Sequence, residues 1–540
     1  MRRLALFASA LVSLFAFAGC AADSAGGEEA TDEGAFSSDQ ATLLDFEFDG
    51  SLVTDSSWND KQTIQDQLLY TIGHLNAQKS VGRLDTLELT NITKTNVGGK
   101  IEIAYHAKLP VAWGSKTNLP ATYELKLPKD VSHAGQQAFT EAHKRTCVDW
   151  AAHDVDAGSM WYYYRPARSG CGITDAEVVK LTATATRSTL NTTGKYPELH
   201  EVWKDDRLEV ISIFGKNEAT GGASDVGVTA FNSFVRMMKA RLRDAQLTTV
   251  PANVSDRPGP DVKDVTVEGT LPDGKKVKVT ALLVDAITSV WAGFDARYES
   301  LTPSADLIMY NGHAGLGQNV RALARKGRWL PAKYQMFFMN GCDTFAYVDG
   351  SLAQTRAALN PDDPAGTKYM EFITNAMPSY FHSMAAASTA MVNGLLEIEQ
   401  PKTYDKIFEG IDRAEVVLVT GEEDNVYEPG MPLGSGGGGD DPDGAFTPFE
   451  ESGSVARNAE KAFSYDAPAG TYTVVLSGTG DADLYVKKDA PAAARVYDCR
   501  PYKNGSAETC EVTFDAPGKL HVMVRGYAAN STFTVKGSKR

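Results

Sequence analysis

Two apolar runs in the middle of the chain end in the same way, on an Asn-Gly pair followed by a residue with reactive chemistry. Residues 306–310 (DLIMY) run into Asn-Gly-His313, and residues 334–339 (YQMFFM) run into Asn-Gly-Cys342. Short apolar runs that do not alternate with polar residues are typical of strands in a parallel sheet, which is covered on both faces. Open α/β sheets carry out their chemistry just beyond the carboxyl ends of the strands. The pattern therefore predicts that His313 and Cys342 follow neighbouring strands, and their separation of 29 positions suits a crossover connection.

Similar apolar runs continue on both sides of this pair and alternate with helical patterns. We predict an α/β domain of three layers over residues 201–428, because strands that alternate with helices form a mostly parallel sheet covered on both faces. Its strands are expected at 208–214, 279–284, 306–310, 334–339 and 416–420, and its helices at 228–242 and 369–387.

The two ends of the chain have other patterns, so the expected fold class is multidomain. Residues 43–200 mix helical and alternating spacing and predict an N-terminal α+β domain. Residues 429–449 are a glycine-rich linker, and residues 450–540 hold short β patterns that predict an all-β sandwich. In the N-terminal domain we expect helices at 62–75 and 133–145, and strands at 84–93, 100–107, 121–127, 161–164 and 178–186.

Residues 1–42 are expected to lie outside the folded domains. Arg2 and Arg3 precede an apolar stretch that is too short to span a bilayer comfortably, as in a signal peptide (residues 1–19). The FAGC sequence that ends at Cys20 resembles a bacterial lipobox, although Phe stands where the lipobox usually has an aliphatic residue. The resemblance implies a lipid on Cys20. Residues 20–42 are poor in apolar side chains and predict a flexible tether.

The lipid would place the protein in the cell envelope, as an outer-membrane lipoprotein that faces the periplasm or the cell surface. Cleavage after Ala18 without lipidation is the alternative and would give a secreted protein. The net charge of −16 argues against a nucleic-acid partner. The sequence leaves the oligomeric state open.

Six cysteines are present, and export implies an oxidising compartment. Cys499 and Cys510 flank a turn and are expected to close a hairpin, while Cys147 and Cys171 form the next pair. Each bridge is expected to stabilise the fold by about 3 kcal/mol. This pairing leaves Cys342 as a single thiol, which is either catalytic or a buried, inert cysteine.

The two strand ends carry the groups that acyl transfer requires. An imidazole can deprotonate a thiol and later protonate a leaving amine. The backbone N–H groups of Ala314, Gly315 and Cys342 are candidates to stabilise an oxyanion, because the neighbouring glycines let the main chain approach a substrate. For His313 alone, the alternative is a hydrogen-bonded histidine in a loop.

This order of motifs resembles the caspase-like (clan CD) cysteine peptidases, and most closely their gingipain-type branch. The resemblance covers about residues 208–420, including the MPSYFH sequence at 377–382. It implies an exported cysteine endopeptidase in which Cys342 is the nucleophile of a thioacyl-enzyme and His313 the general acid and base. Ala314 stands where the family has Gly, and the charge of Asp343 would raise the pKa of the thiol.

Two alternatives accompany this interpretation. The domain is either a catalytically inactive, caspase-like surface-binding lipoprotein, or a transpeptidase that uses the same acyl-enzyme. The expected partners are a peptide or protein substrate and, through the N-terminal lipid, a membrane.

The C-terminal domain resembles the bacterial pre-peptidase C-terminal (PPC) domain. The similarity rests on GDADLYV at 480–486, YDCRPY at 497–502, ETC at 508–510 and Gly526-Tyr527. Members are β-sandwiches appended to exported peptidases. No cofactor is expected. Asp481 and Asp483 are candidates for a structural calcium site, but we favour their interpretation as turn residues beside a strand.

Overall fold

The computed structural model describes residues 36–56, 58–315, 318–347, 350–421, 425–433, 446, 448–514 and 518–539. The chain divides into two compact units. Of the described residues, the first unit holds those up to 431 except 203–206, and the second holds 203–206 and those from 432 onward. Among the helices of the described residues, none has both the length and the apolar character needed to cross a bilayer.

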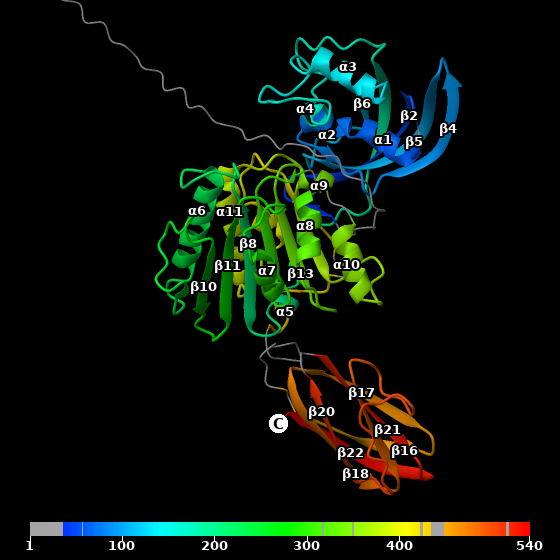
Figure 1. Ribbon diagram of the computed structural model, residues 1–540, viewed down its shortest axis with the longest axis vertical. Helices are drawn as coiled ribbons and strands as arrows, with labels where there is room; N and C mark the ends of the chain where they lie inside the picture. Colours follow the sequence, from blue (N-terminus) through cyan, green and yellow to red (C-terminus); the bar gives the residue numbers. More distant parts are fainter. Residues whose placement is uncertain are drawn as a thin grey trace, which may run out of the picture. The chain divides into compact units, whose positions relative to one another are not determined.

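The centre of the first unit is a nine-stranded sheet with the order β1-β15-β14-β13-β12-β8-β11-β10-β9 (Figure 1). The five strands β11, β8, β12, β13 and β14 run parallel, and the strands outside them are antiparallel to their neighbours. The strands are β1 (Ser37–Ser38), β8 (Arg207–Gly215), β9 (Thr248–Val250), β10 (Asp264–Thr270), β11 (Lys276–Val284), β12 (Leu307–Asn311), β13 (Gln335–Asn340), β14 (Met370–Asn375) and β15 (Val417–Gly421).

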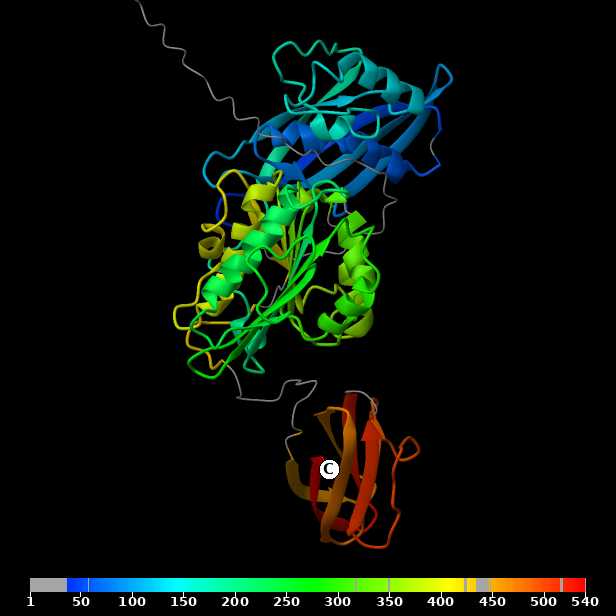
Figure 2. The same cartoon turned by 60° about the vertical axis from the view of Figure 1, so that its left-hand side comes forward.

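Helices cover both faces of this sheet (Figure 2). The helices α6 (Val226–Arg241) and α11 (Phe381–Leu396) pack on one face. The helices α7 (Phe294–Leu301), α8 (Gln318–Lys326) and α10 (Ser351–Leu359) share a buried apolar cluster with strand residues on the other face. The short helices α5 (Leu199–Val202), α9 (Thr344–Tyr347) and α12 (Tyr404–Phe408) lie in the connections. Every residue of β12, β13, β14 and β15 is buried, which explains why these runs lack polar alternation.

The N-terminal part of the first unit has its own antiparallel sheet, ordered β3-β5-β2-β7-β6, with β4 also paired to β5. The strands are β2 (Thr42–Thr54), β3 (Val81–Gly82), β4 (Glu88–Val97), β5 (Lys100–Trp113), β6 (Thr122–Pro128) and β7 (Val178–Arg187). The helices are α1 (Asp60–Leu68), α2 (Tyr70–Asn76), α3 (His133–His143) and α4 (Met160–Tyr163). The predicted bridge between Cys147 and Cys171 is present.

The second unit is a β-sandwich, as predicted. One sheet has the order β16-β22-β18-β20 and the other β17-β21-β19, and apolar residues from both form one buried cluster. The predicted bridge between Cys499 and Cys510 is present. The strands are β16 (Phe449–Ala456), β17 (Glu460–Ala467), β18 (Gly470–Thr479), β19 (Ala482–Lys488), β20 (Glu508–Phe514), β21 (Gly518–Gly526) and β22 (Asn530–Lys539).

Three local predictions are wrong. The aromatic run at 161–164 lies in and beside helix α4 rather than in a strand, because burial of its rings overrides their β propensity. Residues 370–375 form β14 instead of the first half of a helix, and the helix begins only at Phe381. The predicted tether of residues 20–42 ends in ordered structure, because Ser37 and Ser38 pair with β15 as an edge strand.

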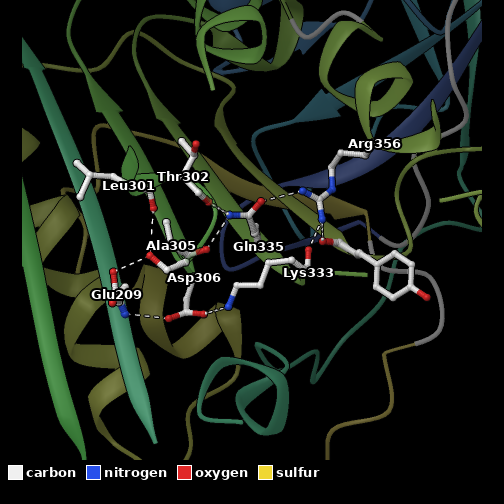
Figure 3. A network of polar contacts seen from close by, with 10 residues as sticks. Glu209, Leu301, Thr302, Ala305, Asp306, Lys333, Gln335 and Arg356 are labelled. Carbon is white, nitrogen blue, oxygen red and sulfur yellow. Dashed lines mark hydrogen bonds and ion pairs between the residues drawn. The ribbon is translucent and has the colours of Figure 1, made fainter. Parts of the chain in front are cut away.

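At the amino ends of the parallel strands, a buried polar network holds the sheet together (Figure 3). The Asp306 carboxylate accepts a hydrogen bond of 2.8 Å from the N–H of Glu209 and forms an ion pair with Lys333. Arg356 donates to the side-chain oxygen of Gln335 at 2.8 Å. Asp306 therefore orients strand ends, and it lies at the end of β12 opposite to His313.

Candidate functional site

His313 and Cys342 follow the carboxyl ends of two neighbouring parallel strands. β12 pairs with β13, and the last residues of the two strands, Asn311 and Asn340, are register partners. The backbone N–H of Gly312 donates to the carbonyl of Asn340 at 3.2 Å, so the two strand-end loops are in direct contact. The structure therefore places both residues at the edge where the sequence predicts them.

A row of buried asparagine side chains runs beneath these loops. Asn340 donates to the side-chain oxygen of Asn311 at 2.9 Å, and Asn375 donates to that of Asn340 at 3.4 Å. Asn311 in turn donates to the hydroxyl of Ser212 on β8 at 3.2 Å. All four side chains are fully buried. We call these three asparagines, at the ends of β12, β13 and β14, the asparagine row.

The imidazole of His313 is held from the loop that follows β8. Its Nε2 lies 3.0 Å from the backbone oxygen of Asn217 and must donate to it, because a carbonyl only accepts. The neutral ring then carries its lone pair on Nδ1. The Asp225 carboxylate fixes the position of Asn217 by accepting its N–H at 3.0 Å, while also capping the start of α6.

The thiol of Cys342 lies in a buried position, with 6% of the residue exposed. Its Sγ donates to the backbone oxygen of Ser379 at 3.7 Å. Within the described residues it is the one cysteine that forms no disulfide bridge. Burial raises the pKa of the neighbouring Tyr380 phenol. Electrostatic repulsion from Cys342 and Glu415, which are negative when ionised, raises this pKa further.

The start of α11 contacts both loops. Ser379 accepts the Cys342 hydrogen bond, and two residues later the ring of Phe381 packs edge-on against His313, with 5.2 Å between ring centroids. The junction of the two loops is tight as well. A Cβ added at Gly341 would lie 2.9 Å from the carbonyl oxygen of Gly312 and 3.3 Å from the backbone nitrogen of Ala314.

A buried carboxylate closes the far end of the asparagine row. Glu415 is fully buried and accepts hydrogen bonds from Asn375 at 3.2 Å, from the N–H of Tyr380 at 3.4 Å and from the hydroxyl of Ser383. Burial raises the pKa of the Glu415 carboxyl to about 7, although these hydrogen bonds lower it in part. This carboxyl therefore changes its charge near neutral pH. It contacts the backbone of Tyr380, and the preceding residue, Ser379, accepts the hydrogen bond from Cys342.

The remaining predicted site residues lie in the loop after β12, at the N-terminus and in the C-terminal domain. Ala314 is buried, and Gly315 is half-buried with a φ of +59°, a left-handed conformation that suits glycine. Cys20 lies outside the described residues. Asp483 pairs with Arg500 at 2.9 Å, and Asp481 accepts the N–H of Gly505 at 2.8 Å.

Each of these two carboxylates thus accepts a hydrogen bond from a protein donor, Asp483 from Arg500 and Asp481 from Gly505. Asp481 directly precedes β19. Asp483 belongs to β19 itself rather than to a turn. In the part of the chain that the structure describes, no cluster of three or more His, Cys, Asp or Glu side chains suits a metal ion.

Sequence reasoning missed Asn217, Asp225 and Glu415. Asp225 had a local signal, because aspartate before a helical run is a common N-cap. Asn217 acts through its backbone oxygen and Glu415 through contacts with distant segments, so neither had a signal in the local pattern.

A family model described as "Bacterial pre-peptidase C-terminal domain" matches residues 459–526. These residues span β17 to β21 of the sandwich. The C-terminal domain is therefore a PPC domain, as its motifs predict.

Relatives that share this domain are named as proteases. The chain is 43% identical over 72 residues to a neutral protease of Vibrio proteolyticus, which covers 13% of this chain and 12% of the relative. It is 37% identical over 102 residues to alkaline serine exoprotease A of Vibrio alginolyticus, covering 18% and 19%. It is 39% identical over 85 residues to a zinc metalloprotease of Helicobacter pylori, covering 15% and 33%. The chain thus spans a third or less of each relative, and the similarity is confined to the PPC domain.

These names contradict the predicted type of enzyme. Two of these relatives are named as a serine exoprotease and a zinc metalloprotease and none as a cysteine protease, so the prediction of a cysteine endopeptidase with a thioacyl-enzyme is wrong by this comparison. The transpeptidase alternative uses the same intermediate and falls with it. The physical reason is that a PPC domain accompanies more than one catalytic chemistry, and the architecture of a domain does not determine its reaction.

Among solved structures, the periplasmic g-type lysozyme inhibitor PliG of Aeromonas hydrophila is 20% identical. It covers 18% of this chain and 89% of its own, with a TM-score of 0.15, which is too low to support an argument about the fold.

Proposed function

We propose that the protein is an exported peptidase whose site lies at the carboxyl edge of the nine-stranded sheet, at the strand ends that carry His313 and Cys342. The PPC domain supports the activity class, because its relatives are named as proteases. The position of the site is supported by the converging loops after β12 and β13, since ligands of open α/β sheets bind beyond the carboxyl ends of the strands.

The observation that carries the proposal is the way His313 is held. Peptide hydrolysis needs a group that transfers protons near neutral pH, and histidine is the side chain best suited to this. The bond to the Asn217 oxygen fixes the tautomer, and contact with Phe381 fixes the ring plane. Backbone N–H groups at Ala314, Gly315 and Cys342 are the proposed donors to the carbonyl oxygen of the substrate.

Export is supported by the two disulfide bridges, which persist in oxidising compartments. A relative of Xanthomonas campestris, 37% identical over 87 residues, is named as an extracellular protease. Lipidation of Cys20 and attachment to the outer membrane are the finer part of this proposal. The caspase-like architecture of residues 201–428 belongs to it as well, and the order of the parallel strands supports it.

The test is hydrolysis of an unfolded protein substrate by the purified full chain, with a His313→Ala variant beside it. We expect the variant to be slower by about 100-fold or more, because a positioned proton-transfer group contributes that much. His382→Ala is the matched control. That side chain is on α11, is 68% exposed and should leave the rate unchanged.

Absence of hydrolysis by the wild-type chain would contradict the activity. Equal rates for the wild type and His313→Ala would place the site elsewhere. Parallel reactions with a chelator, a serine-directed phosphonate and an alkylating agent would then assign the chemical type of the peptidase.

A further inference from the structure

We infer that the N-terminal domain is a built-in part of the proposed site, and that Asn76 is a positioning residue for the turn that carries Cys342. The inference deepens the proposed function, and its activity readout rests on that function. It assigns a role to residues 43–200, in which the sequence shows no chemistry of its own.

The contact between Asn76 and Asp343 carries the inference. Asn76 is the last residue of α2, and its amide donates to the Asp343 carboxylate at 2.9 Å. Asp343 directly follows Cys342, and both Asn76 and Asp343 are buried, with 5% and 0% exposed. A buried carboxylate needs hydrogen-bond donors to be stable, so the contact with this amide contributes to where the carboxylate lies.

The backbone of Asp343 has a conformation that few residue types adopt readily. Its φ of +50° lies in the left-handed region, which disfavours residues that have a Cβ. Its N–H donates to the carbonyl of Met377 at 3.2 Å, which connects the turn to the segment before α11. The turn after Cys342 is therefore fixed on one side by the residues that precede α11 and on the other by the N-terminal domain.

The helix that follows the turn is held by the same domain. The ring of Phe345 on α9 packs edge-on against Phe36 at 6.3 Å, and the guanidinium of Arg83 lies 5.6 Å from its centre. Tyr347 packs edge-on against Trp161 of α4 at 6.3 Å. These α9 residues belong to the same buried cluster as the core of the N-terminal domain.

The domain is also anchored where it leaves and rejoins the central sheet. The N–H of Phe36 donates to the carbonyl of Leu190 at 2.7 Å, and the N–H of Thr192 donates to the carbonyl of Phe36 at 2.8 Å. Ser37 and Ser38 then form the edge strand β1 of the central sheet. Cutting the domain away after residue 192 would thus remove an edge strand, which argues against a segment that is shed on activation.

The test exchanges the two partners in the full chain. Asn76→Asp places two carboxylates next to each other. The double variant Asn76→Asp with Asp343→Asn restores one carboxylate and one amide, with their positions exchanged. Circular dichroism checks the fold. The readouts are the rate and pH profile of Cys342 alkylation by iodoacetamide, located by peptide mass, and the rate of peptide hydrolysis.

For Asn76→Asp we expect alkylation of the buried thiol to become faster by about tenfold and hydrolysis slower by about tenfold, with both returning to within about threefold of wild type in the double variant. In Asp343→Asn the pH midpoint of alkylation should fall, because a neighbouring carboxylate raises a thiol pKa. The midpoint should return in the double variant. Gln78→Glu is the matched control, since it adds the same charge two residues away at an exposed position.

Equal behaviour of Asn76→Asp and the double variant would overturn the inference, and so would wild-type behaviour of both. If Asn76→Asp does not fold, Asn76→Ala and Asp343→Asn test the same contact, and an unchanged alkylation rate and pH profile in both would overturn it. If the wild type hydrolyses no peptide but alkylation responds as expected, the positioning role stands and the proposed activity fails.

Discussion

The side-chain amide of Asn340 donates to the side-chain oxygen of Asn311 across 2.9 Å, at matched positions on β13 and β12. An amide both donates and accepts, so asparagines can bond to one another along a sheet edge, whereas ionised carboxylates only accept. Both side chains are fully buried, so this hydrogen bond is shielded from water and keeps the ends of β12 and β13 in register. The loops that carry His313 and Cys342 begin one residue later, so they start from matched positions on the two strands.

Replacing Asn340 tests the asparagine row. Asn340→Ala removes a donor to Asn311 and an acceptor for Asn375, and we expect the first unit to lose about 1–3 kcal/mol of stability, the cost of buried polar groups left unpaired. The measurement is urea unfolding of the full chain followed by circular dichroism. Asn393→Ala, at a half-buried position of α11 where the side chain meets an exposed arginine, is the control and should cost much less. Equal losses would show that the row adds nothing specific.

A second prediction concerns the junction of the two loops. In Gly341→Ala the new Cβ would lie 2.9 Å from the backbone oxygen of Gly312, a contact that cannot be relieved by rotating a side chain. We expect the loops to separate, with a stability loss of about 1–3 kcal/mol and a changed rate of Cys342 alkylation. Gly222→Ala, where a Cβ would meet nothing within 4 Å, is the control. A thermal midpoint and alkylation rate equal to those of the control would contradict the tight junction.

Much of this edge was predictable because its signals are local. The unbroken apolar runs before His313 and Cys342 indicate buried parallel strands, and the Asn-Gly pairs mark where those strands end. The bridge between Cys499 and Cys510 was predictable because a turn separates the two residues. In each case a few consecutive residues carry the information.

The parts that were not predictable depend on contacts between distant segments. Asn76 and Asp343 are 267 positions apart, and the carbonyl of Asn217 is 96 positions from His313. Residues 370–375 are a strand because β13 and β15 lie on either side, although their own pattern also suits a helix. Tertiary pairing decided each of these, and a linear pattern does not encode it.

A third prediction concerns the PPC domain. The guanidinium of Arg500 donates to Asp483 at 2.9 Å and lies 3.9 Å from the ring centre of Tyr502 and 4.7 Å from that of Tyr485. A lysine keeps the charge but has no planar group to stack between rings. We therefore expect Arg500→Lys to lower the stability of this domain by about 1–3 kcal/mol.

The measurement for Arg500 is thermal unfolding of the full chain, with the transition of the sandwich followed separately. Arg495→Lys, at an exposed position of the same connection, is the control and should leave the transition in place. If both substitutions shift it equally, the stacked arrangement of Arg500 does not stabilise the domain.

The last prediction is a dependence of stability on pH. The pKa of Glu415 is raised from 4.5 to about 7 by burial, so the folded protein holds a proton that the unfolded chain has already lost between these values. Stability must therefore fall as the pH rises through this window, by roughly 3 kcal/mol for this group alone. Burial raises the pKa of Glu371 to about 7 as well, so the wild-type curve contains both contributions.

Glu415→Gln isolates the first contribution, because glutamine stays neutral at every pH. We expect its unfolding free energy, measured by urea denaturation below and above the window, to fall by roughly 3 kcal/mol less than that of the wild type. Glu409→Gln is the control. Its carboxyl is paired with Lys406 at 2.8 Å, which lowers its pKa, so its charge does not change within the window. A Glu415→Gln curve parallel to the wild-type curve would mean that this carboxyl is already ionised in the fold at low pH, and that the donors around it outweigh its burial.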